Sequence, residues 1–424
     1  MPDPIVTVLA TLDSKGEEAR CACEALRRAG AVPRLVDTSC RPHAAPGDYL
    51  PAGRLAEEAG RRWEELAPME RGAAADVIVA GGRKVLSAWL REGELAGVLG
   101  LGGANGANIA CGIMRALPPL LPKVMVSPVA ATAAVQWFVA ESDIAMFPSI
   151  GDFSLNRFTR AIIGSASLAA AAMARGWATR SGAAEKKIPL VGVSSFGGTA
   201  ACVNRVEARL REAGFEVILF HASGPGGRAL ESLARLGELA GVVDVTTHEM
   251  TDLLVGGVYS AGEGRLRGAG EAGIPQVVVP GALDHANFWA GQVPEAYRGR
   301  AFFRYNPQNL LMRTNEEEFE ALGRMVAERL NAAKGPFAVL IPKRGYSEHT
   351  KRAAHDLEGR PVGPWLQPEA DAAFARSLRA HLKRGRAEEL DLHINDPAFA
   401  DACADAFLEM ARAGAGAPAG GEGG

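Results

Sequence analysis

Short apolar runs rich in β-branched residues alternate along the chain with longer segments in which apolar residues recur every three or four positions. The first run, Ile5–Ala10, has the length and composition of a buried strand, and Glu17–Ala29 has the spacing of an amphipathic helix. Regular alternation of these two kinds of segment is typical of parallel sheets with helices on both faces. The expected strands of the first half are Ile5–Ala10, Val32–Val36, Asp76–Ala80, Ala96–Leu101 and Lys123–Val126.

The same plan begins again near residue 188. At a constant offset of 184 residues, Leu26–Gly30 (Leu-Arg-Arg-Ala-Gly) matches Leu210–Gly214 (Leu-Arg-Glu-Ala-Gly). A further match pairs Leu95–Val98 with Leu239–Val242. We interpret these matches as a two-lobed pseudo-repeat; the alternative is chance similarity, since Ala, Gly and Val are common in this chain. The expected strands of the second half are Pro189–Val193, Phe215–Phe220, Leu239–Val245, Ile274–Val279 and Ala338–Ile341.

The sequence therefore predicts an α/β fold of two Rossmann-like subdomains with mostly parallel sheets and a ligand cleft between them. The predicted subdomains are residues 1–183 and 184–412, because the polar stretch Arg180–Lys187 separates the two series of strands. Residues 413–424 consist mostly of Gly and Ala and lack the side chains to build a core. We predict that this tail is disordered.

Composition and charge exclude several classes of protein. Of the 424 residues, 48% are hydrophobic and 22% charged, and the formal net charge is −3, which is typical of a globular protein and argues against nucleic-acid binding. The six cysteines have no metal-ligand spacing, and no export signal is visible, so we expect a cytoplasmic protein. The Ala-rich stretch Ala161–Ala172 is too short to span a bilayer, and no membrane role is expected.

Glycine-rich loops follow several of the expected strands. In doubly wound sheets, ligands bind beyond the carboxyl ends of the strands, and the loop Gly102–Asn108 would present backbone amides and a helix N-terminus to an anion there. Tight packing alone also requires glycine at such turns, so one loop does not establish a phosphate site. Similar loops are Thr11–Gly16, Ser194–Thr199, His221–Arg228 and Thr246–Glu249.

Together these loops suit a polyanionic ligand with a divalent cation. Lys15 or Arg228 would neutralise phosphate, and the Asp13 carboxylate would reach Mg²⁺ directly or through water. The Asn105 side chain adds a hydrogen-bond donor. The candidate cofactor-binding residues are Asp13, Lys15, Gly102, Gly103, Asn105, Gly106, Gly197, Gly198, Thr199, Gly226, Gly227, Arg228, Thr246 and Thr247, with Asp13 also the candidate metal ligand.

Eight motifs, in order between about residue 5 and residue 411, resemble one family. They are Ala10–Gly16, Gly100–Gly106, Pro122–Ser127, Phe220–Gly227, Gly256–Gly262, Gly273–Val278, Gly281–Asp284 and Ile394–Phe399. The chain resembles the ATP-binding domain family of the tomato mosaic virus resistance protein, whose bacterial members are largely uncharacterised. The resemblance implies two α/β subdomains, a homodimer, Mg²⁺-ATP bound by the N-terminal module, and a separate TIM-barrel protein as partner. Antiviral binding is not expected to transfer.

Two histidines depart from the pattern of that family. A third Thr is expected where His248 stands, and an apolar residue where His285 stands. In one interpretation, a metal or acid–base cluster forms from His248, Glu249, Asp252, Asp284 and His285. In the other, the neighbouring threonines cap a helix and the histidines bond the backbone. The segment Tyr346–His349 also follows an expected strand and is interpreted either as part of the cleft or as an exposed loop.

Three functional hypotheses stay open. The first is a protein that binds Mg²⁺-ATP or a related phosphorylated ligand and transfers a phosphoryl or nucleotidyl group, alone or with the barrel protein. The second is a non-catalytic, nucleotide-sensing module. The third is a sugar-phosphate or nucleotide-sugar enzyme whose lobes close around the substrate. The sequence names no catalytic residue and leaves open whether the chain is an enzyme.

Overall fold

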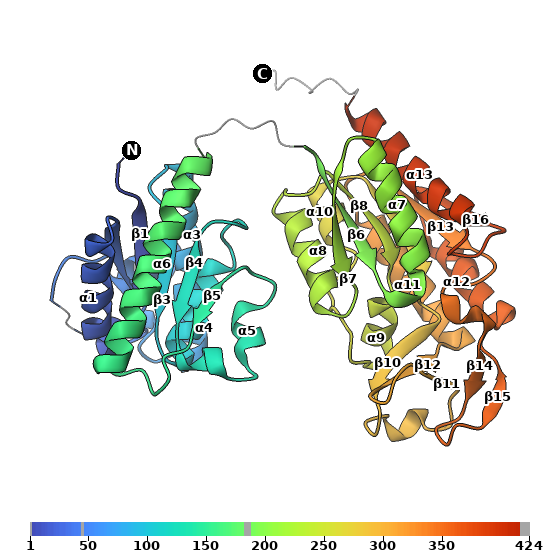
Figure 1. Cartoon of the computed structure of the whole chain (residues 1–424), viewed down its shortest axis with the longest axis horizontal. Coiled ribbons are helices and arrows are strands. Elements are labelled where there is room, and N and C mark those ends of the chain that lie inside the picture. Colours follow the sequence, from blue (N-terminus) through green and yellow to red (C-terminus); the bar gives the residue numbers. More distant parts are fainter. Residues whose placement is uncertain (1, 44–45, 182–187, 416–424) are drawn as a thin grey trace. The chain divides into compact units, whose positions relative to one another are not determined.

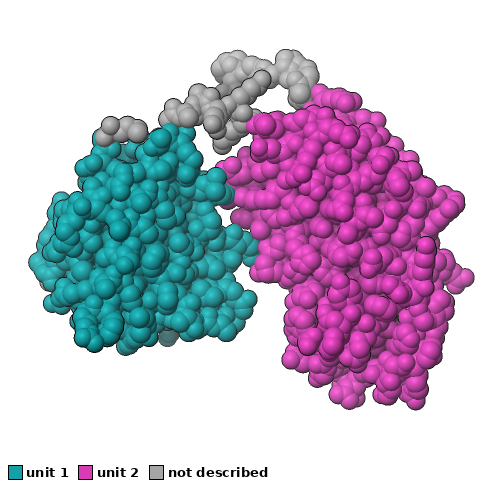
Figure 2. All heavy atoms as spheres, in the orientation of Figure 1, with its two compact units in different colours: residues 1–186 teal, residues 187–424 magenta. Residues whose placement is uncertain are grey.

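The computed structural model describes residues 2–43, 46–181 and 188–415. The chain divides into two compact units, residues 1–186 (unit 1) and 187–424 (unit 2), each taken by itself below (Figure 2). The predicted boundary after residue 183 lies outside the described residues, and the predicted cleft between the units stays a prediction. Within the described ranges, no helix is long and apolar enough to cross a membrane.

Unit 1 is a parallel sheet with helices on both faces (Figure 1). Its strands lie in the order β2-β1-β3-β4-β5 and are β1 (Ile5–Ala10), β2 (Val32–Asp37), β3 (Gly97–Leu101), β4 (Lys123–Val126) and β5 (Ala145–Phe147). One apolar cluster joins the sheet to α1 (Leu12–Arg28) and α6 (Arg157–Ser181). A second cluster joins it to α2 (Ala52–Glu58), α3 (Arg71–Arg91), α4 (Ala104–Met114) and α5 (Val135–Val139).

The main sheet of unit 2 is also parallel, in the order β16-β13-β9-β8-β6-β7. Its strands are β6 (Leu190–Ser195), β7 (Glu216–His221), β8 (Gly241–Thr246), β9 (Gln276–Gly281), β13 (Phe337–Pro342) and β16 (Arg386–Leu390). When the strands of each parallel sheet are numbered in chain order, the first five have the same spatial order in both units, 2-1-3-4-5, and unit 2 adds β16 at one edge. The two mostly parallel sheets are thus confirmed, and the shared order supports a pseudo-repeat.

Helices cover both faces of this second sheet (Figure 1). One apolar cluster contains α7 (Ala200–Glu212) and α13 (Pro397–Ala415). The opposite face carries two clusters, whose helices are α8 (Pro225–Arg235) and α10 (Gly268–Ala272) in one and α11 (Glu316–Asn331) and α12 (Pro368–His381) in the other. The short helix α9 (Glu249–Val255) follows β8 at the carboxyl edge of the sheet.

A third sheet, which the sequence did not predict, belongs to unit 2. It is antiparallel, in the order β10-β12-β11-β14-β15, with β10 (His285–Trp289), β11 (Phe302–Arg304), β12 (Asn309–Arg313), β14 (Ala353–His355) and β15 (Pro361–Pro364). Because β10 starts four residues after β9 ends, this sheet is attached at the carboxyl edge of the parallel sheet.

Two expectations about local structure are wrong. The apolar run Asp76–Ala80 is part of helix α3, where Ile78 packs into the core beside small residues, Ala74 and Ala75. Helix α13 continues to Ala415, so residues 413–415 of the predicted disordered tail are helical. The rest of that tail lies outside the described residues.

Candidate functional site

In unit 1, the loops of interest lie where the strand order reverses. Strand β1 lies between β2 and β3, so the β1–α1 and β3–α4 loops flank the topological switch point of a doubly wound sheet. They are close in space, because a Cβ atom added to Gly106 would lie 3.8 Å from Oγ1 of Thr11. Gly103 is the N-cap of α4, and no side chain caps the helix. Since the first amides of a helix have no partner within it, α4 presents donors at this edge.

Two glycines of the β3–α4 loop, Gly102 and Gly103, differ in whether packing requires a glycine at that position. A Cβ on Gly102 would lie 2.9 Å from Cα of Gly106, so tight packing excludes a side chain there. No atom lies within 4 Å of the Cβ position of Gly103, and its φ of −68° is accessible to any residue. Packing therefore explains Gly102 but not Gly103. The Asn105 side chain is half-buried in the first turn of the helix.

The charged candidates of unit 1 lie in the first turns of α1. Asp13 is exposed, and its carboxylate accepts a hydrogen bond from Oγ of Ser14 at 3.0 Å. The Lys15 ammonium donates to the carbonyl of Phe153, which brings it to the segment after β5. A cavity of about 440 Å³ beside this loop is lined by Leu12, Asp13, Ser14, Gly16, Glu17, Glu18, Arg20, Leu35, Pro46, Ser154 and Leu155.

The sequence analysis missed Asp37, which organises this edge. The buried carboxylate accepts hydrogen bonds from the amide of Leu12 at 3.1 Å and from the amide and hydroxyl of Ser39 at 2.9 and 2.6 Å. Asp37 thus fixes the β1–α1 loop to the end of β2. The position of Asp37 in the sequence could have indicated this role, because it directly follows an expected strand. A carboxylate that is buried there needs hydrogen-bond partners.

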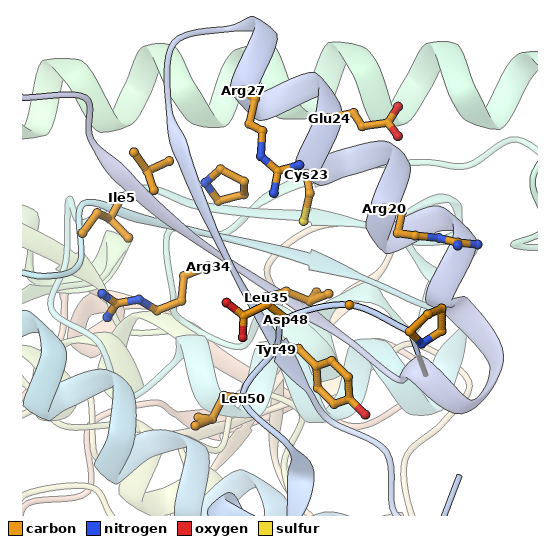
Figure 3. Close-up of a pocket in the computed structure, with 14 residues that line it drawn as sticks. Ile5, Arg20, Cys23, Glu24, Arg27, Arg34, Leu35, Asp48, Tyr49 and Leu50 are labelled. Carbon is orange, nitrogen blue, oxygen red and sulfur yellow. The ribbon is translucent and has the colours of Figure 1, made fainter. Parts of the chain in front are cut away.

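A second cavity of unit 1, of about 460 Å³, is lined by residues of α1, β2 and the segment 46–50 (Figure 3). Arg20 and Arg27 reach it from α1, and Arg34 reaches it from β2. Arg34 is already paired with Glu94 at 3.0 Å, and its guanidinium lies over the ring of Trp89. The Arg34 side chain therefore has a structural role, and none of the predicted site residues lines this cavity.

In unit 2, the loop after β7 already holds an anion of the protein itself. The amides of Gly224 and Gly227 donate to Oε1 of Glu249 at 2.6 and 3.2 Å. A Cβ on Gly227 would lie 2.1 Å from Oε2 of Glu249, and one on Gly226 would lie 1.9 Å from the carbonyl oxygen of His221. Close packing therefore explains why glycine stands at both positions. A contact of Gly226, Gly227 or Arg228 with a ligand stays a prediction.

Glu249 belongs to a buried ionic network that the sequence analysis missed. The Arg265 guanidinium, with no exposed surface, pairs with Glu249 at 2.7 Å, with Glu231 at 3.1 Å and with Asp244 at 2.5 Å. Burial raises the pKa of Glu249, while the charge of Arg265 lowers it. Glu231 also accepts from three backbone amides, those of residues 266, 267 and 268. Through these hydrogen bonds and ion pairs, the network connects the loops after β7 and α9 to the end of β8.

The predicted threonines bond one another and the backbone. Thr199, at the end of the turn Gly197–Thr199 that precedes α7, lies with its Oγ1 2.7 Å from Oγ1 of Thr246. The Thr247 hydroxyl donates to the carbonyl of Val279 at 2.8 Å. These hydroxyls therefore connect the ends of β6, β8 and β9. Their proposed contact with a ligand stays a prediction.

Three buried imidazoles, which we call the histidine cluster, lie at the same edge: His248, His285 and His349. The ring centroids of His248 and His285 are 5.7 Å apart, and those of His285 and His349 are 5.6 Å apart. His248 follows β8, His285 follows β9 and His349 follows β13, so three neighbouring strands of the sheet carry the cluster. The ring of Phe196, at the end of β6, stacks on His248 at 4.2 Å.

Hydrogen bonding in the cluster is incomplete. Neither ring nitrogen of His248 has a hydrogen-bond partner, and Nε2 of His285 and Nδ1 of His349 have none. Nδ1 of His285 lies 3.0 Å from Oδ1 of Asp284. Asp284 also accepts from the Ser347 hydroxyl at 2.7 Å and from the indole N–H of Trp365 at 2.8 Å, two partners that the sequence did not indicate.

The metal interpretation of this region finds no support in the geometry. The Glu249 carboxylate is bound by Arg265, and Oδ1 of Asp252 accepts from the amides of Tyr259 and Asn287 at 3.0 and 3.2 Å. Nowhere in residues 2–43, 46–181 and 188–415 do three or more His, Cys, Asp or Glu side chains converge as metal ligands would. The acid–base interpretation of Asp284 and His285 is compatible with the geometry.

Burial of the histidines gives unit 2 a stability that is lost in acid. Burial holds the pKa of His248 well below 6.5, and burial lowers the pKa of His349 to about 4. A histidine whose pKa falls on folding contributes stability above its unfolded pKa, and this contribution decreases as the pH falls through that value towards the folded pKa.

We therefore expect the free energy of unfolding to fall between pH 6.5 and pH 4, by up to about 1.4 kcal/mol per pH unit for each such histidine. His248→Phe keeps a ring stacked on Phe196 and removes one titrating group, so its pH dependence should be correspondingly shallower. Urea unfolding at several pH values measures both slopes. Parallel curves for the two proteins would contradict this role of His248.

Comparison with known proteins places both units in one family. Residues 4–179 match the N-terminal domain, and residues 188–411 the C-terminal domain, of an uncharacterised protein family, UPF0261. The UPF0261 protein RA0729 of Rhizobium meliloti is 40% identical over 411 residues, which cover 96% of this chain and 99% of that protein. The UPF0261 protein of Clostridium tetani is 36% identical over 410 residues, with 96% and 98% covered.

The resemblance to the family of the tomato mosaic virus resistance protein is confirmed as a relationship. The ToMV resistance protein Tm-1(GCR237) of Solanum lycopersicum is 34% identical over 436 residues, which cover 96% of this chain but 56% of that protein. A solved UDP-GlcNAc 2-epimerase of Neisseria meningitidis covers 65% of this chain and 81% of its own, at 10% identity and a TM-score of 0.23, too low to support any conclusion. The matches to both domains show that the chain belongs to the UPF0261 family.

Proposed function

We propose that the protein binds a phosphorylated small molecule at the carboxyl edge of the unit 1 sheet, with Mg²⁺-ATP as the first candidate. The observation that carries the proposal is the uncapped N-terminus of α4 beside the β1–α1 loop, at the switch point of the sheet. Helix N-termini at this place bind phosphate groups through backbone amides and the helix dipole. Gly103 leaves these amides uncovered, and no packing contact explains why a glycine stands there.

The residues at this edge fit a ligand that brings its own metal ion. Asp13 is a single exposed carboxylate, which suits Mg²⁺ held chiefly by phosphate oxygens and water. Lys15 lies in the same loop and would add a positive charge. Binding of Mg²⁺-ATP, a homodimer and a partner TIM-barrel protein remain parts of the proposal that rest on the family resemblance. The proposal includes two alternative functions for this site: transfer of a phosphoryl group, or sensing of the nucleotide without catalysis.

The Gly103→Val substitution tests the site. Valine is compatible with the backbone at this position, so we expect a folded protein whose new side chain covers the first amides of α4. At a ligand concentration about 100 times Kd, Mg²⁺-ATP should stabilise the wild type by about 2.7 kcal/mol and the variant by far less. Thermal unfolding with and without Mg²⁺-ATP, and calorimetric titration, measure the difference.

Gly164→Val is the matched control, because Gly164 lies in α6 with no atom within 4 Å of its Cβ position. It should keep the full response to Mg²⁺-ATP. An unchanged response of Gly103→Val would exclude the α4 N-terminus from the site. Hydrolysis of ATP that requires an added acceptor would favour the transfer version, and tight binding without turnover would favour sensing.

A further inference from the structure

We propose that unit 2 holds a second site, in which His248 and His285 bind a hydroxyl group of a sugar-like molecule and His285 accepts its proton. This site is separate from the one proposed in unit 1 and does not depend on it. Five strand ends of one sheet edge contribute to it, through Phe196 after β6, His221 at the end of β7, and the histidine cluster after β8, β9 and β13.

The unpartnered ring nitrogens are the first observation that points to a ligand. His248 and His285 have no exposed surface, and three of their four ring nitrogens lack a hydrogen-bond partner. A buried polar group without a partner costs about 1–3 kcal/mol, so folded proteins rarely leave several in one place. Imidazole nitrogens of this kind require a polar atom within hydrogen-bond distance, which either a ligand or ordered water supplies.

The chemistry of the cluster selects the kind of ligand. The low pKa of His248 keeps this imidazole neutral, so it offers one N–H donor and one acceptor nitrogen. A hydroxyl group, which both donates and accepts, complements such a ring. An ionised carboxylate, which only accepts hydrogen bonds, would leave the acceptor nitrogens without a partner. The site is therefore matched to the hydroxylated part of a molecule rather than to its charged part.

His285 is the nitrogen base of this arrangement. Its Nδ1 faces Asp284 at 3.0 Å, which assigns the proton to Nδ1 and leaves Nε2 as the acceptor. Burial alone would raise the pKa of Asp284, but hydrogen bonds from His285 and Ser347 and the charge of Arg313 hold it well below its usual value. Asp284 stays ionised and stabilises an imidazolium. When Nε2 takes the hydroxyl proton, the electron pair of the O–H bond stays on the ligand oxygen.

Aromatic side chains provide the walls of the site. Phe196 covers His248 at 4.2 Å, and Tyr259 meets Phe196 edge-on at 6.0 Å and Trp289 at 5.7 Å. Rings of this kind fit the apolar faces of a sugar ring, as in many small-molecule sites. Phe196 is partly exposed and is followed by two glycines.

The test uses the full chain and defined probes: glucose 6-phosphate, fructose 6-phosphate, ribose 5-phosphate and inorganic phosphate. At saturation, at least one sugar phosphate should raise the melting temperature of the wild type by roughly 5 °C or more, while inorganic phosphate should not. His248→Phe and His285→Gln should lose this response. His381→Phe, at a histidine on α12 bonded to the carbonyl of Ser377, should keep it.

Circular dichroism first establishes that each variant is folded. A wild type that responds to no sugar phosphate, or a His248→Phe protein that responds as the wild type does, would overturn the proposal, and water would then be the partner of the histidines. An equal response to inorganic phosphate in the Gly103→Val protein, whose proposed site in unit 1 is blocked, would show that the hydroxyl groups are not recognised, which also overturns it. Gly103→Val should keep the sugar-phosphate response, so the proposals for units 1 and 2 fail independently.

A pH profile separates a proton acceptor from a merely structural histidine. If Nε2 of His285 must be unprotonated to accept the hydroxyl proton, sugar-phosphate affinity of the wild type should be lower in acid than at pH 8. The His285→Gln protein retains a hydrogen-bonding side chain but does not titrate, so any residual binding should lose this dependence. The same profile in both proteins would contradict the role of His285 as the base.

Discussion

Arg265→Met is expected to destabilise unit 2 by about 3–5 kcal/mol, because it leaves three buried carboxylates without their cation. Asp244, Glu231 and Glu249 are each at most 4% exposed in their side chains, and Arg265 donates hydrogen bonds to all three. Methionine fills much of the same volume but supplies no charge. Without this charge, the buried carboxylates would either stay ionised and uncompensated or take up protons, and both outcomes lower the free energy of unfolding. Urea unfolding at pH 7 measures the loss.

The same substitution should be less harmful in acid, since protonated carboxyl groups need no counter-ion. Arg344→Met is the matched control, because Arg344 pairs with Asp391 at 2.7 Å on the surface, where both side chains are mostly exposed. That variant should leave the free energy of unfolding nearly unchanged. Equal, small effects of the two substitutions would mean that the network of Arg265 does not stabilise unit 2.

Gly81→Ala is expected to destabilise unit 1 by about 3 kcal/mol, although alanine is the better helix former. Gly81 lies within α3, and a Cβ atom there would be 1.7 Å from the carbonyl oxygen of Leu55 in α2. A backbone carbonyl cannot rotate away as a side chain does. The two helices would therefore have to separate, which disturbs the apolar cluster that they share. Thermal unfolding of unit 1 measures the change.

Gly164→Ala provides the comparison within the same unit. Gly164 also lies inside a helix, α6, but no atom is within 4 Å of its Cβ position. Here the higher helix propensity of alanine should act alone and stabilise the protein by about 0.5–1 kcal/mol. If Gly81→Ala were stabilising to the same extent, the close approach of α2 and α3 at Gly81 would be incorrect.

Local sequence pattern identified most of the parallel strands but missed β5 and β16. Ile5–Ala10 and Glu216–His221 are contiguous runs with high strand propensity, and each is followed or preceded by a helix of the expected spacing. Asp76–Ala80 has a similar apolar composition, but it packs as part of a longer helix against α2 and α4. Tertiary contacts overrode strand propensity there, since a five-residue apolar run does not distinguish a strand from one turn of a buried helix.

The antiparallel sheet could not be predicted from local sequence pattern, for a different reason. Its strands β10, β11 and β12 are three to five residues long and are separated by irregular segments. Two of its strands, β14 and β15, come more than 35 residues after β12, beyond a helix and a strand of the parallel sheet. Pairing of this kind depends on contacts distant in sequence, which periodicity does not report.

The sequence by itself determined the α/β class, the doubled plan and the position of the polar loops at strand ends, because these follow from the spacing of apolar residues along the chain. Only the tertiary structure decided what each polar side chain meets. The amide of Gly227, whose contact with a ligand stays a prediction, donates to the carboxylate of Glu249, and Asp284 pairs with His285, Ser347 and Trp365. Hydrogen bonds and ion pairs depend on distances of about 3 Å between atoms that folding brings together, and residue spacing along the chain does not contain those distances.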